Sequence, residues 1–358
     1  MRILQIITKS ELGGAQSVLT TLVNSLVQNH EVIVVGGEGN GKMWEVISDK
    51  AIKINCPYLK RSISIINDIK ATFFLHKIYH QYNPDIIHLH SSKAGILGRL
   101  AFPKCKIVYT VHGFDSIRIA FRRMLPIEKI MQTHCQAIVG VSQYDVDNLR
   151  NEGITHGLSL IYNGVERPKT INKKDIVFST EVNSYTKKIL CIARLTQPKR
   201  PDIFMETASM LPNYAFIWIG NQFDVNEHPN NVFFMGNIPQ ASRYCQEIDA
   251  FMLASDYEGL PMVILEAMSY GKPIFASKVG GTSEIVMEGY NGYTLKNKAD
   301  LFVEKIKYVL DDPKIYNDFS QHSLMLYNQK FTAQKMIENY YTLYLSLIHI
   351  SEPTRHSL

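Results

Sequence analysis

Two glutamates after a predicted strand are the residues of this chain best placed to do chemistry. Glu258 and Glu266 follow an apolar run that ends at Leu253, and Glu266 lies among aliphatic residues inside a predicted helix. A carboxylate in such surroundings needs a polar partner, so we expect both glutamates to bind a ligand. The alternative is an ordinary acid ahead of a helix at Glu258 and a solvent-facing side chain at Glu266.

The helix that holds Glu266 is expected to begin near Gly259. Pro261 suits a first helical turn, where its missing N–H breaks no hydrogen bond. The free N–H groups at Gly259 and Leu260, with the positive end of the helix dipole, would then form a site for an anion.

Two cations bracket a turn after another predicted strand. Arg194 and Lys199 follow the apolar run 189–193 and precede a helix. A guanidinium binds phosphate through two parallel hydrogen bonds and an ammonium binds it as a point charge, so the pair would hold a diphosphate. Basic surface turns are common, but the position of this turn after the first strand of a second domain favours a ligand.

Two glycine pairs also follow predicted strands. Gly280-Gly281 precedes a helix expected to be capped by Thr282 or Ser283, and Gly13-Gly14 joins the first strand to the first helix. Both turns would bring backbone N–H groups close to a phosphate or a sugar. The spacing around Gly13 is not G-x-G-x-x-G, which weakens a dinucleotide-binding interpretation.

Histidines end two further strands. His112 ends the run 107–112 and is expected to contact a ligand, although a lone histidine is more often structural. His88 and His90 have an H-x-H spacing that zinc sites use, but no further ligand lies near them in sequence, so no metal site is expected. We expect packing for His88 and an acceptor-side role for His90 or Lys93.

An alternation of strands and helices must position these residues. Amphipathic segments such as 17–28, 67–82 and 300–310 separate short β-branched runs, a pattern typical of parallel sheets covered by helices on both faces. The predicted strands are 3–7, 31–35, 86–90, 107–112, 137–142, 189–193, 215–220, 250–253 and 273–276. The expected fold class is α/β, with two Rossmann-like doubly wound domains facing across a cleft, because ligands bind beyond the carboxyl ends of such strands.

The domain limits follow from the same pattern. The polar stretch 166–186 has no strong period and is predicted to be a linker between a domain at 1–165 and a domain at 187–330. Residues 345–358 are similar to a translated transposon-derived sequencing adapter. We therefore expect the natural sequence to be cut off near Tyr344 and the remainder to be an assembly artefact. The aspartates Asp145 and Asp147 fall in a predicted helix, where both would be solvated.

The composition excludes several classes of protein. At 358 residues with 46% hydrophobic content, the chain can form two packed domains. A net charge of +5 is too small for a dedicated nucleic-acid binder and fits an anionic ligand or an anionic membrane surface. The five cysteines are scattered, which favours reduced thiols in the cytoplasm. No apolar run reaches the ~20 residues that span a bilayer.

Together these motifs resemble the family 4 glycosyltransferases of the GT-B fold, from Met1 to about Tyr344. The paired glutamates of that family appear as Glu258 and Glu266, its basic turn as Arg194 and Lys199, and its glycine turn as Gly280-Gly281. Segment 162–165 is similar to the hinge of the family and 289–293 to its G-x-N-G-x turn. Arg200 departs from the pattern, since glycine commonly follows the lysine there.

The resemblance implies retention of anomeric configuration, no required metal and no cofactor, with a UDP- or GDP-linked sugar as co-substrate. It also implies a helix at 331–344 that returns to the first domain. The resemblance also implies a role for each candidate residue. The departing nucleoside diphosphate is stabilised by Arg194, Lys199, Gly259 and Leu260, and it is approached by Gly13 and Gly14. Glu266 binds ribose hydroxyls, Glu258 binds sugar hydroxyls, and His112 contacts the transferred sugar.

The first domain is similar to those of bacterial enzymes that build capsule, exopolysaccharide or O-antigen units on undecaprenyl diphosphate, which implies a glycan or lipid-linked acceptor. Segment 117–125 is basic and apolar, so it would lie on an anionic membrane at the inner face of the cytoplasmic membrane, or else form an ordinary surface helix. Two alternatives remain. The paired glutamates argue against a GT-B-fold sugar-nucleotide epimerase, and Glu258, Arg194 and Lys199 argue against a non-catalytic nucleotide-sugar-binding subunit.

Overall fold

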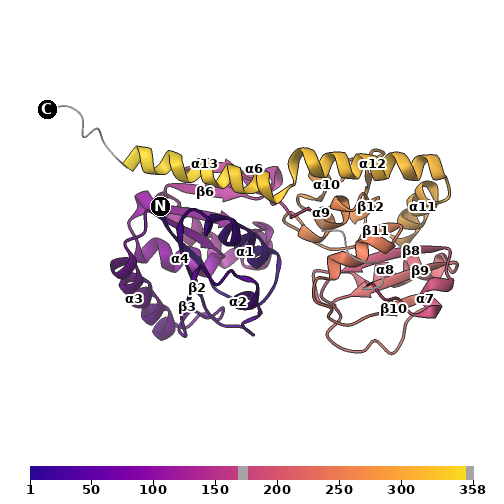
Figure 1. Ribbon diagram of the computed structural model, residues 1–358, viewed down its shortest axis with the longest axis horizontal. Coiled ribbons are helices and arrows are strands. Elements are labelled where there is room, and N and C mark those ends of the chain that lie inside the picture. The colour runs from indigo at the N-terminus through magenta and orange to yellow at the C-terminus, as the bar shows by residue number, and fades with distance from the viewer. Residues whose placement is uncertain (168–175, 352–358) are drawn as a thin grey trace. The chain divides into compact units, whose positions relative to one another are not determined.

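The computed structural model describes residues 1–167 and 176–351, and the chain divides into two compact units (Figure 1). The first holds Met1–Gly164 and the chain from Ala333 onward, and the second holds Val165–Thr332. Part of the predicted linker, 168–175, lies outside the described residues, as do residues 352–358 of the predicted artefact 345–358. From 176 on, the predicted linker is a packed segment of the second unit, because it buries Ile176 and Phe178 and forms helix α7 (Thr180–Ser184).

The first unit is built on a seven-stranded parallel sheet in the order β3-β2-β1-β4-β5-β6-β7. Its strands are β1 (Arg2–Ile7), β2 (Glu31–Gly36), β3 (Ile52–Asn55), β4 (Ile86–His90), β5 (Ile107–Val111), β6 (Ala137–Gly140) and β7 (Leu158–Leu160). Its α-helices are α1 (Gly14–Leu26), α2 (Lys42–Val46), α3 (Ile65–Tyr82), α4 (Ser92–Ala101), α5 (Leu125–Met131), α6 (Gln143–Asn151) and α13 (Ala333–Ser351). The strand order reverses between β1 and β4, the position where such sheets bind ligands.

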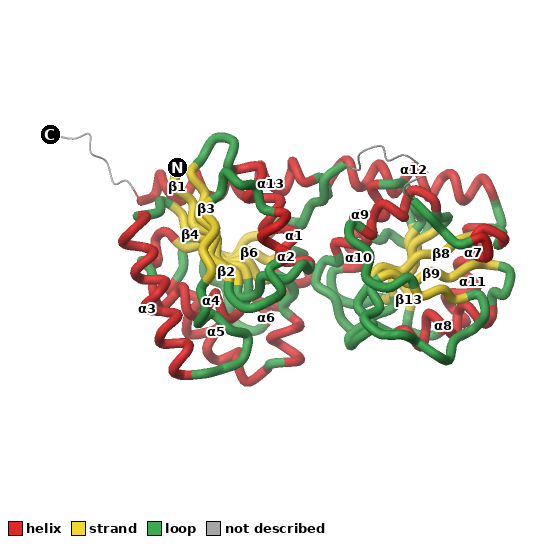
Figure 2. Tube along the Cα trace, turned by 60° about the horizontal axis from the view of Figure 1, so that its bottom comes forward, coloured by secondary structure: helices red, strands yellow, loops and turns green. Residues whose placement is uncertain are grey.

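The second unit repeats this plan with a six-stranded parallel sheet in the order β10-β9-β8-β11-β12-β13. Its strands are β8 (Lys187–Ile192), β9 (Tyr214–Ile219), β10 (Val232–Phe234), β11 (Ala250–Leu253), β12 (Ile274–Ser277) and β13 (Gly292–Leu295). Besides α7, its α-helices are α8 (Pro201–Met210), α9 (Met262–Ser269), α10 (Thr282–Ile285), α11 (Ala299–Leu310) and α12 (Pro313–Lys330). The order reverses between β8 and β11, and the expected fold class of two doubly wound α/β domains is confirmed (Figure 2).

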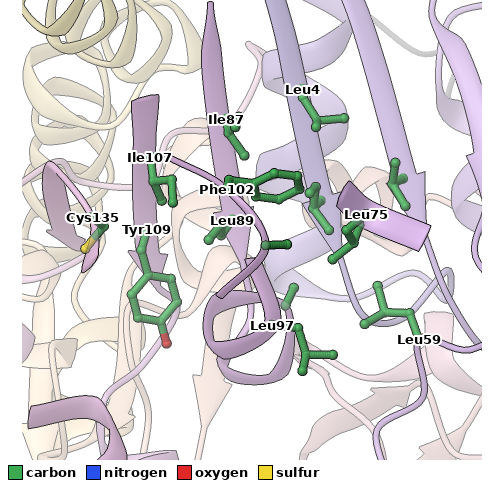
Figure 3. Close-up of a cluster of buried hydrophobic side chains, with 14 of the residues drawn as sticks. Leu4, Leu59, Leu75, Ile87, Leu89, Leu97, Phe102, Ile107, Tyr109 and Cys135 are labelled. Atoms are coloured by element: carbon green, nitrogen blue, oxygen red, sulfur yellow. The ribbon is translucent and has the colours of Figure 1, made fainter. Parts of the chain in front are cut away.

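Helices cover the faces of the sheets, so the central strands are buried along their whole length. In the first unit, aliphatic residues of β1, β4 and β5 pack with α4 in one cluster (Figure 3). Gly98 lets α4 approach β4 closely, because a Cβ there would lie 2.5 Å from the side chain of Leu89. Among the helices that the structure describes, none is long and apolar enough to cross a membrane.

Candidate active site

Two loops meet at the strand-order reversal of the second unit. The turn after β8 is tied to the loop after β11 by backbone hydrogen bonds: Arg200 N–H donates to Ala254 O (3.0 Å) and Asp256 N–H donates to Pro198 O (2.9 Å). The basic turn and the segment that carries the first predicted glutamate therefore form one joined edge, as parallel strands at a reversal allow.

Lys199 and Glu258 form an ion pair across this edge. Lys199 Nζ donates to Glu258 Oε1, and the hydroxyl of Ser255 donates to the same carboxylate oxygen (2.6 Å). Both charged side chains keep some exposure, 18% for Lys199 and 12% for Glu258. An anion that binds Lys199 therefore competes with Glu258 for the ammonium group, while Ser255 continues to hold the carboxylate.

The two arginines of the turn differ in what they contact. Arg194 is exposed and forms no hydrogen bond or ion pair with any residue that the structure describes, so its guanidinium is available to a ligand. Arg200 is bound to Asp202 and Asp256, and these carboxylates raise its pKa above the usual value. Arg200, the departure from the family pattern, therefore ties the two loops together.

The glycine turn Gly280-Gly281 packs directly on the loop of the first glutamate. Gly281 N–H donates to Gly259 O (2.9 Å). Gly280 has a φ of +54°, and a Cβ added there would lie 1.7 Å from Glu258 O. Only glycine fits at position 280, and the turn fixes the backbone beside the Glu258 carboxylate.

Helix α9 begins at Met262, so the predicted helix start near Gly259 is wrong. Leu260 precedes a proline, and a residue in that position avoids the helical region. Pro261 itself is extended (φ −69°, ψ 112°) and caps the helix instead of forming its first turn. Gly259 and Leu260 therefore form a loop ahead of the helix, and the helical N–H groups start at Met262.

Glu266 lies half-buried on α9, and its carboxyl group has no hydrogen-bond partner within residues 1–167 and 176–351. Burial raises the pKa of this carboxyl to about 7. A carboxylate in an apolar site with unmet acceptors suits hydroxyl donors of a ligand.

A polar network behind Glu258 was missed by the sequence analysis. Ser255 N–H donates to the hydroxyl of Ser277 (2.8 Å), which donates to Asn297 Oδ1, and Asn297 Nδ2 returns a bond to Ser255 O (3.0 Å). Neither Thr282 nor Ser283 caps the helix, because Gly281 is the N-cap, and the hydroxyl of Thr282 donates to Ser277 O (2.7 Å) instead. In the sequence, only Ser277 at the end of β12 indicated this network. Asn297 gave no signal, because it follows β13, a strand that was not predicted.

In the first unit, His112 directly follows β5, and its Nε2 lies 3.1 Å from His90 Nδ1. Burial lowers the pKa of His112 to about 4, so the imidazole is neutral at neutral pH. The turn after His112 is fixed by Asp145, whose Oδ1 accepts the N–H of Phe114 (2.7 Å). Asp145 is fully buried, so its predicted solvation is wrong, whereas Asp147 is exposed.

The other two histidines are structural in this unit. His88 and His90 are fully buried and hydrogen-bonded through both ring nitrogens, so packing of His88 is confirmed and an acceptor contact for His90 is wrong. Lys93 pairs with Asp68 (2.6 Å). In the described part of the chain, no group of three or more His, Cys, Asp and Glu is arranged to hold a metal ion.

The first glycine pair lies at the start of α1. Gly13 is extended and precedes the helix, and Gly14 is its first residue. The preceding loop is held by Gln16, whose side-chain amide donates to Lys9 O (3.1 Å). The helical N–H groups of α1 therefore begin at the carboxyl edge of β1, a position suited to an anion or a sugar hydroxyl.

Known proteins share this architecture and these segments. The Glycosyltransferase Family 4 model matches residues 12–167, and the model for Glycosyl transferases group 1 matches residues 172–323. The UDP-Gal:alpha-D-GlcNAc-diphosphoundecaprenol alpha-1,3-galactosyltransferase of Escherichia coli is 26% identical over 86% of this chain and 87% of its own. The O-antigen biosynthesis glycosyltransferase WbnH of Escherichia coli is 28% identical over 96% of this chain and 98% of its own.

The fold has a close match among solved structures. Anabaena Alr3699/HepE in complex with UDP and glucose superimposes with a TM-score of 0.80 at 18% identity, over 97% of this chain and all of that one. The two family models cover the two Rossmann-like units in turn, and the relatives align over most of the chain. This chain therefore belongs to the family 4-like glycosyltransferases of the GT-B fold.

Proposed function

We propose that this enzyme is a retaining hexosyltransferase that moves a sugar from a UDP- or GDP-linked donor to a glycan or undecaprenyl-diphosphate-linked acceptor in bacterial surface polysaccharide synthesis. The joined edge of the second unit carries the proposal, since it gathers Arg194, Lys199, Glu258 and the turn Gly280-Gly281 where doubly wound sheets bind ligands. The names of the Escherichia coli relatives support the donor class, the lipid-linked acceptor and the O-antigen context.

The cations of the edge fit the leaving nucleoside diphosphate. Charge grows on that group as the glycosidic bond breaks, and fixed donors aimed at developing charge are usually the largest catalytic contribution. Arg194 is unpaired among the described residues, and Lys199 exchanges Glu258 for the diphosphate. The two cations take the place that a metal ion would otherwise fill.

The acidic residues fit the neutral parts of the donor. Glu258, released from Lys199 but still held by Ser255, accepts hydrogen bonds from sugar hydroxyls. Glu266 accepts hydrogen bonds from the ribose, which does not react. In the first unit, family resemblance assigns the diphosphate to Gly13-Gly14 and the transferred sugar to His112. The acceptor proton passes to the leaving phosphate, consistent with retention without a covalent enzyme intermediate.

A peripheral membrane contact is better supported by α3 than by segment 117–125. In that segment Ile117 and Leu125 are buried, and Arg118 and Arg122 pair with acidic residues. By contrast, α3 lies at the surface of its unit (Figure 1) and exposes large apolar side chains at helical spacing: Ile66, Ile69 and Phe73 are 69%, 52% and 72% exposed. Exposed cations of the same region, Lys60, Arg61, Lys70 and Lys77, suit an anionic bilayer at the cytoplasmic face.

A donor screen tests the proposed reaction. UDP-, GDP- and dTDP-sugars are supplied with and without an undecaprenyl-diphosphate sugar, and nucleoside diphosphate release and the anomeric configuration of the product are measured. We expect acceptor-dependent release and a product with the configuration of the donor. Inversion would contradict retention, an epimerised donor formed without acceptor would favour the epimerase, and donor binding without turnover would favour the non-catalytic subunit.

A further inference from the structure

A chain of hydrogen bonds runs from His112 into the interior of the first unit. His112 Nε2 lies 3.1 Å from His90 Nδ1, and His90 Nε2 lies 2.6 Å from Gln5 Oε1. The side-chain amide of Gln5 then donates to the hydroxyl of Tyr344 on α13 (3.3 Å). Gln5, His90 and Tyr344 are fully buried, so no water competes for these groups from outside.

The chain continues beyond α13 to β4 and β5. The hydroxyl of Tyr344 lies 2.6 Å from His88 Nδ1, and His88 Nε2 lies 2.7 Å from the hydroxyl of Thr110, which bonds Tyr340 at 3.0 Å. All these side chains are buried. Seven side chains from three strands, the residue after β5 and the last helix thus form one network, and such networks reinforce their members.

The histidines in the network are neutral. Burial lowers the pKa of His88 and His90 well below the usual value, and it lowers that of His112 to about 4. A neutral imidazole has one nitrogen that donates and one that accepts, and the bond at one nitrogen sets the role of the other. The direction of the bonds is therefore transmitted along the network.

Gln5 sets that direction. Its carbonyl oxygen faces His90, so His90 must donate through Nε2–H and accept at Nδ1. His112 must then donate through Nε2–H. Toward α13 the same rule applies, because Tyr344 accepts from Gln5 and must donate to His88 Nδ1, which leaves His88 with Nε2–H for Thr110.

One atom at the end of the network has no partner. His112 Nδ1 is buried and forms no hydrogen bond with a described residue. In the Nε2–H form this nitrogen carries a lone pair, so it is an acceptor, and a buried acceptor without a donor is unfavourable. A ligand hydroxyl would satisfy it, whereas a carbonyl or phosphate oxygen would not.

We propose that Gln5 and Tyr344 are positioning residues that fix His112 in the Nε2–H tautomer, so that Nδ1 accepts a hydrogen bond from a hydroxyl of the transferred sugar. The sugar contact rests on the proposed function, but the tautomer does not. Helix α13 thereby sets the tautomer of His112, at the carboxyl end of β5, although no side chain of α13 contacts the ligand.

Nitrogen-15 NMR of histidine side chains in the full-length protein, without substrate, tests the tautomer directly. Signals are assigned with single His→Gln variants. We expect Nε2–H forms at His88, His90 and His112. An Nδ1–H form at His90 or His112 would overturn the proposal, whether or not the enzyme transfers sugar. A failed donor screen alongside the expected tautomers would instead contradict the proposed function and leave the network standing.

The variant Gln5→Met tests the positioning role, because it cuts the network between Tyr344 and His90 while leaving the Tyr344–His88 bond. We expect His90 and His112 to become tautomer mixtures and kcat to fall about tenfold with little change in donor KM, since misorienting a positioned group mainly slows the chemical step. Unchanged His112 tautomer and kcat would refute the role.

Tyr341→Phe is the matched control. It removes a hydroxyl from the same helix, and that hydroxyl forms no hydrogen bond with the residues that the structure describes. We expect parental tautomers and parental kcat. Should Gln5→Met fail to fold, Tyr344→Phe replaces it, with loss of the single His112 tautomer as the expected result and an unchanged His112 signal as the contradicting one.

Discussion

Both sheets reverse their strand order between the first and the fourth strand of the unit, but the side chains at their carboxyl edges differ in charge and burial. In the second unit the edge holds Arg194, the Lys199–Glu258 pair and Glu266, all charged or titratable and none fully buried. In the first unit the residues behind His112 are neutral, buried and bonded to one another.

This difference reflects the ligands that each edge can accept. Charges that must meet a diphosphate stay partly exposed, because burying an unpaired ion is costly and a half-exposed ion pair can exchange partners. Rearranging a neutral buried network costs more free energy, so the network keeps one direction of hydrogen bonding. The first edge therefore suits hydroxyl recognition and the second suits anion stabilisation.

The largest effect is expected from Lys199→Ala. If Lys199 stabilises charge that develops only as the bond breaks, kcat and kcat/KM should fall together by on the order of 10²-fold. Lys278→Ala is the control, because Lys278 forms an exposed ion pair with Glu288 in the same unit. Steady-state kinetics with donor varied at saturating acceptor measures both. A rise in KM alone for Lys199→Ala would show binding without transition-state stabilisation.

The second prediction concerns the turn that supports Glu258. Gly280→Ala places a Cβ against Glu258 O at a positive φ, so we expect the free energy of unfolding to fall by about 2 kcal/mol or more. Gly153→Ala in the first unit also has a positive φ but no atom within 4 Å of the new Cβ, and it should cost only about 1 kcal/mol. Equal losses in urea unfolding would contradict the packing described here.

The third prediction concerns Glu266. Its carboxyl has a pKa of about 7, raised by burial, so the carboxylate forms as the pH rises through that value. If the carboxylate binds ribose hydroxyls, kcat/KM for the donor should rise with pH through about 7. Glu266→Gln should lose this step and raise donor KM about tenfold with a smaller change in kcat, since charged hydrogen bonds contribute roughly 1.5–3 kcal/mol. A retained pH step in the variant would exclude Glu266 as its source.

The same shift has a consequence for stability. The unfolded chain loses this proton near pH 4.5 and the folded chain near pH 7, so ionisation opposes folding increasingly between those values. The unfolding temperature of Glu266→Gln should therefore increase relative to that of the parent enzyme as the pH rises from 5 to 8. A constant difference across this range would argue against the raised pKa.

The smallest effect is expected at the proposed membrane face. Replacing Ile66 and Phe73 with serine should lower partition onto anionic vesicles about fivefold, because two partly inserted apolar side chains together contribute on the order of 1 kcal/mol. The matched control replaces Ile119 and Phe121, which are also exposed. Co-sedimentation measures both variants, and equal loss would refute the preference for α3.

The central strands were predictable from the sequence, and the four edge strands were not. Strands β3, β7, β10 and β13 occupy the edges of the two sheets, and all were missed. Each has three or four residues and lacks the continuous buried run of β4 or β11, because helices cover an edge strand less completely. Short, half-exposed runs give no clear period.

The candidate site divides in a similar way. Glu258 and Lys199 were identifiable because their types and their positions after strands are local properties of the sequence. The bonds of Gln5 to His90 and Tyr344 join residues 85 and 339 positions apart, so no local spacing reveals them. The start of α9 was predicted wrongly because a proline before a helix fits either the cap or the first turn, and only the backbone angles distinguish the two.

Titration of UDP and GDP into the purified enzyme with a metal chelator present tests whether the Lys199–Glu258 edge receives the nucleoside diphosphate without a metal ion. Calorimetry of the parent, Lys199→Ala and Lys278→Ala compares the affinities. We expect one nucleotide to bind the parent and Lys278→Ala equally and to bind Lys199→Ala about tenfold more weakly, as loss of a charge-assisted contact requires. Equal affinity in all three proteins would show that Lys199 does not contact the diphosphate, and binding that disappears with the chelator would show that a metal ion is required.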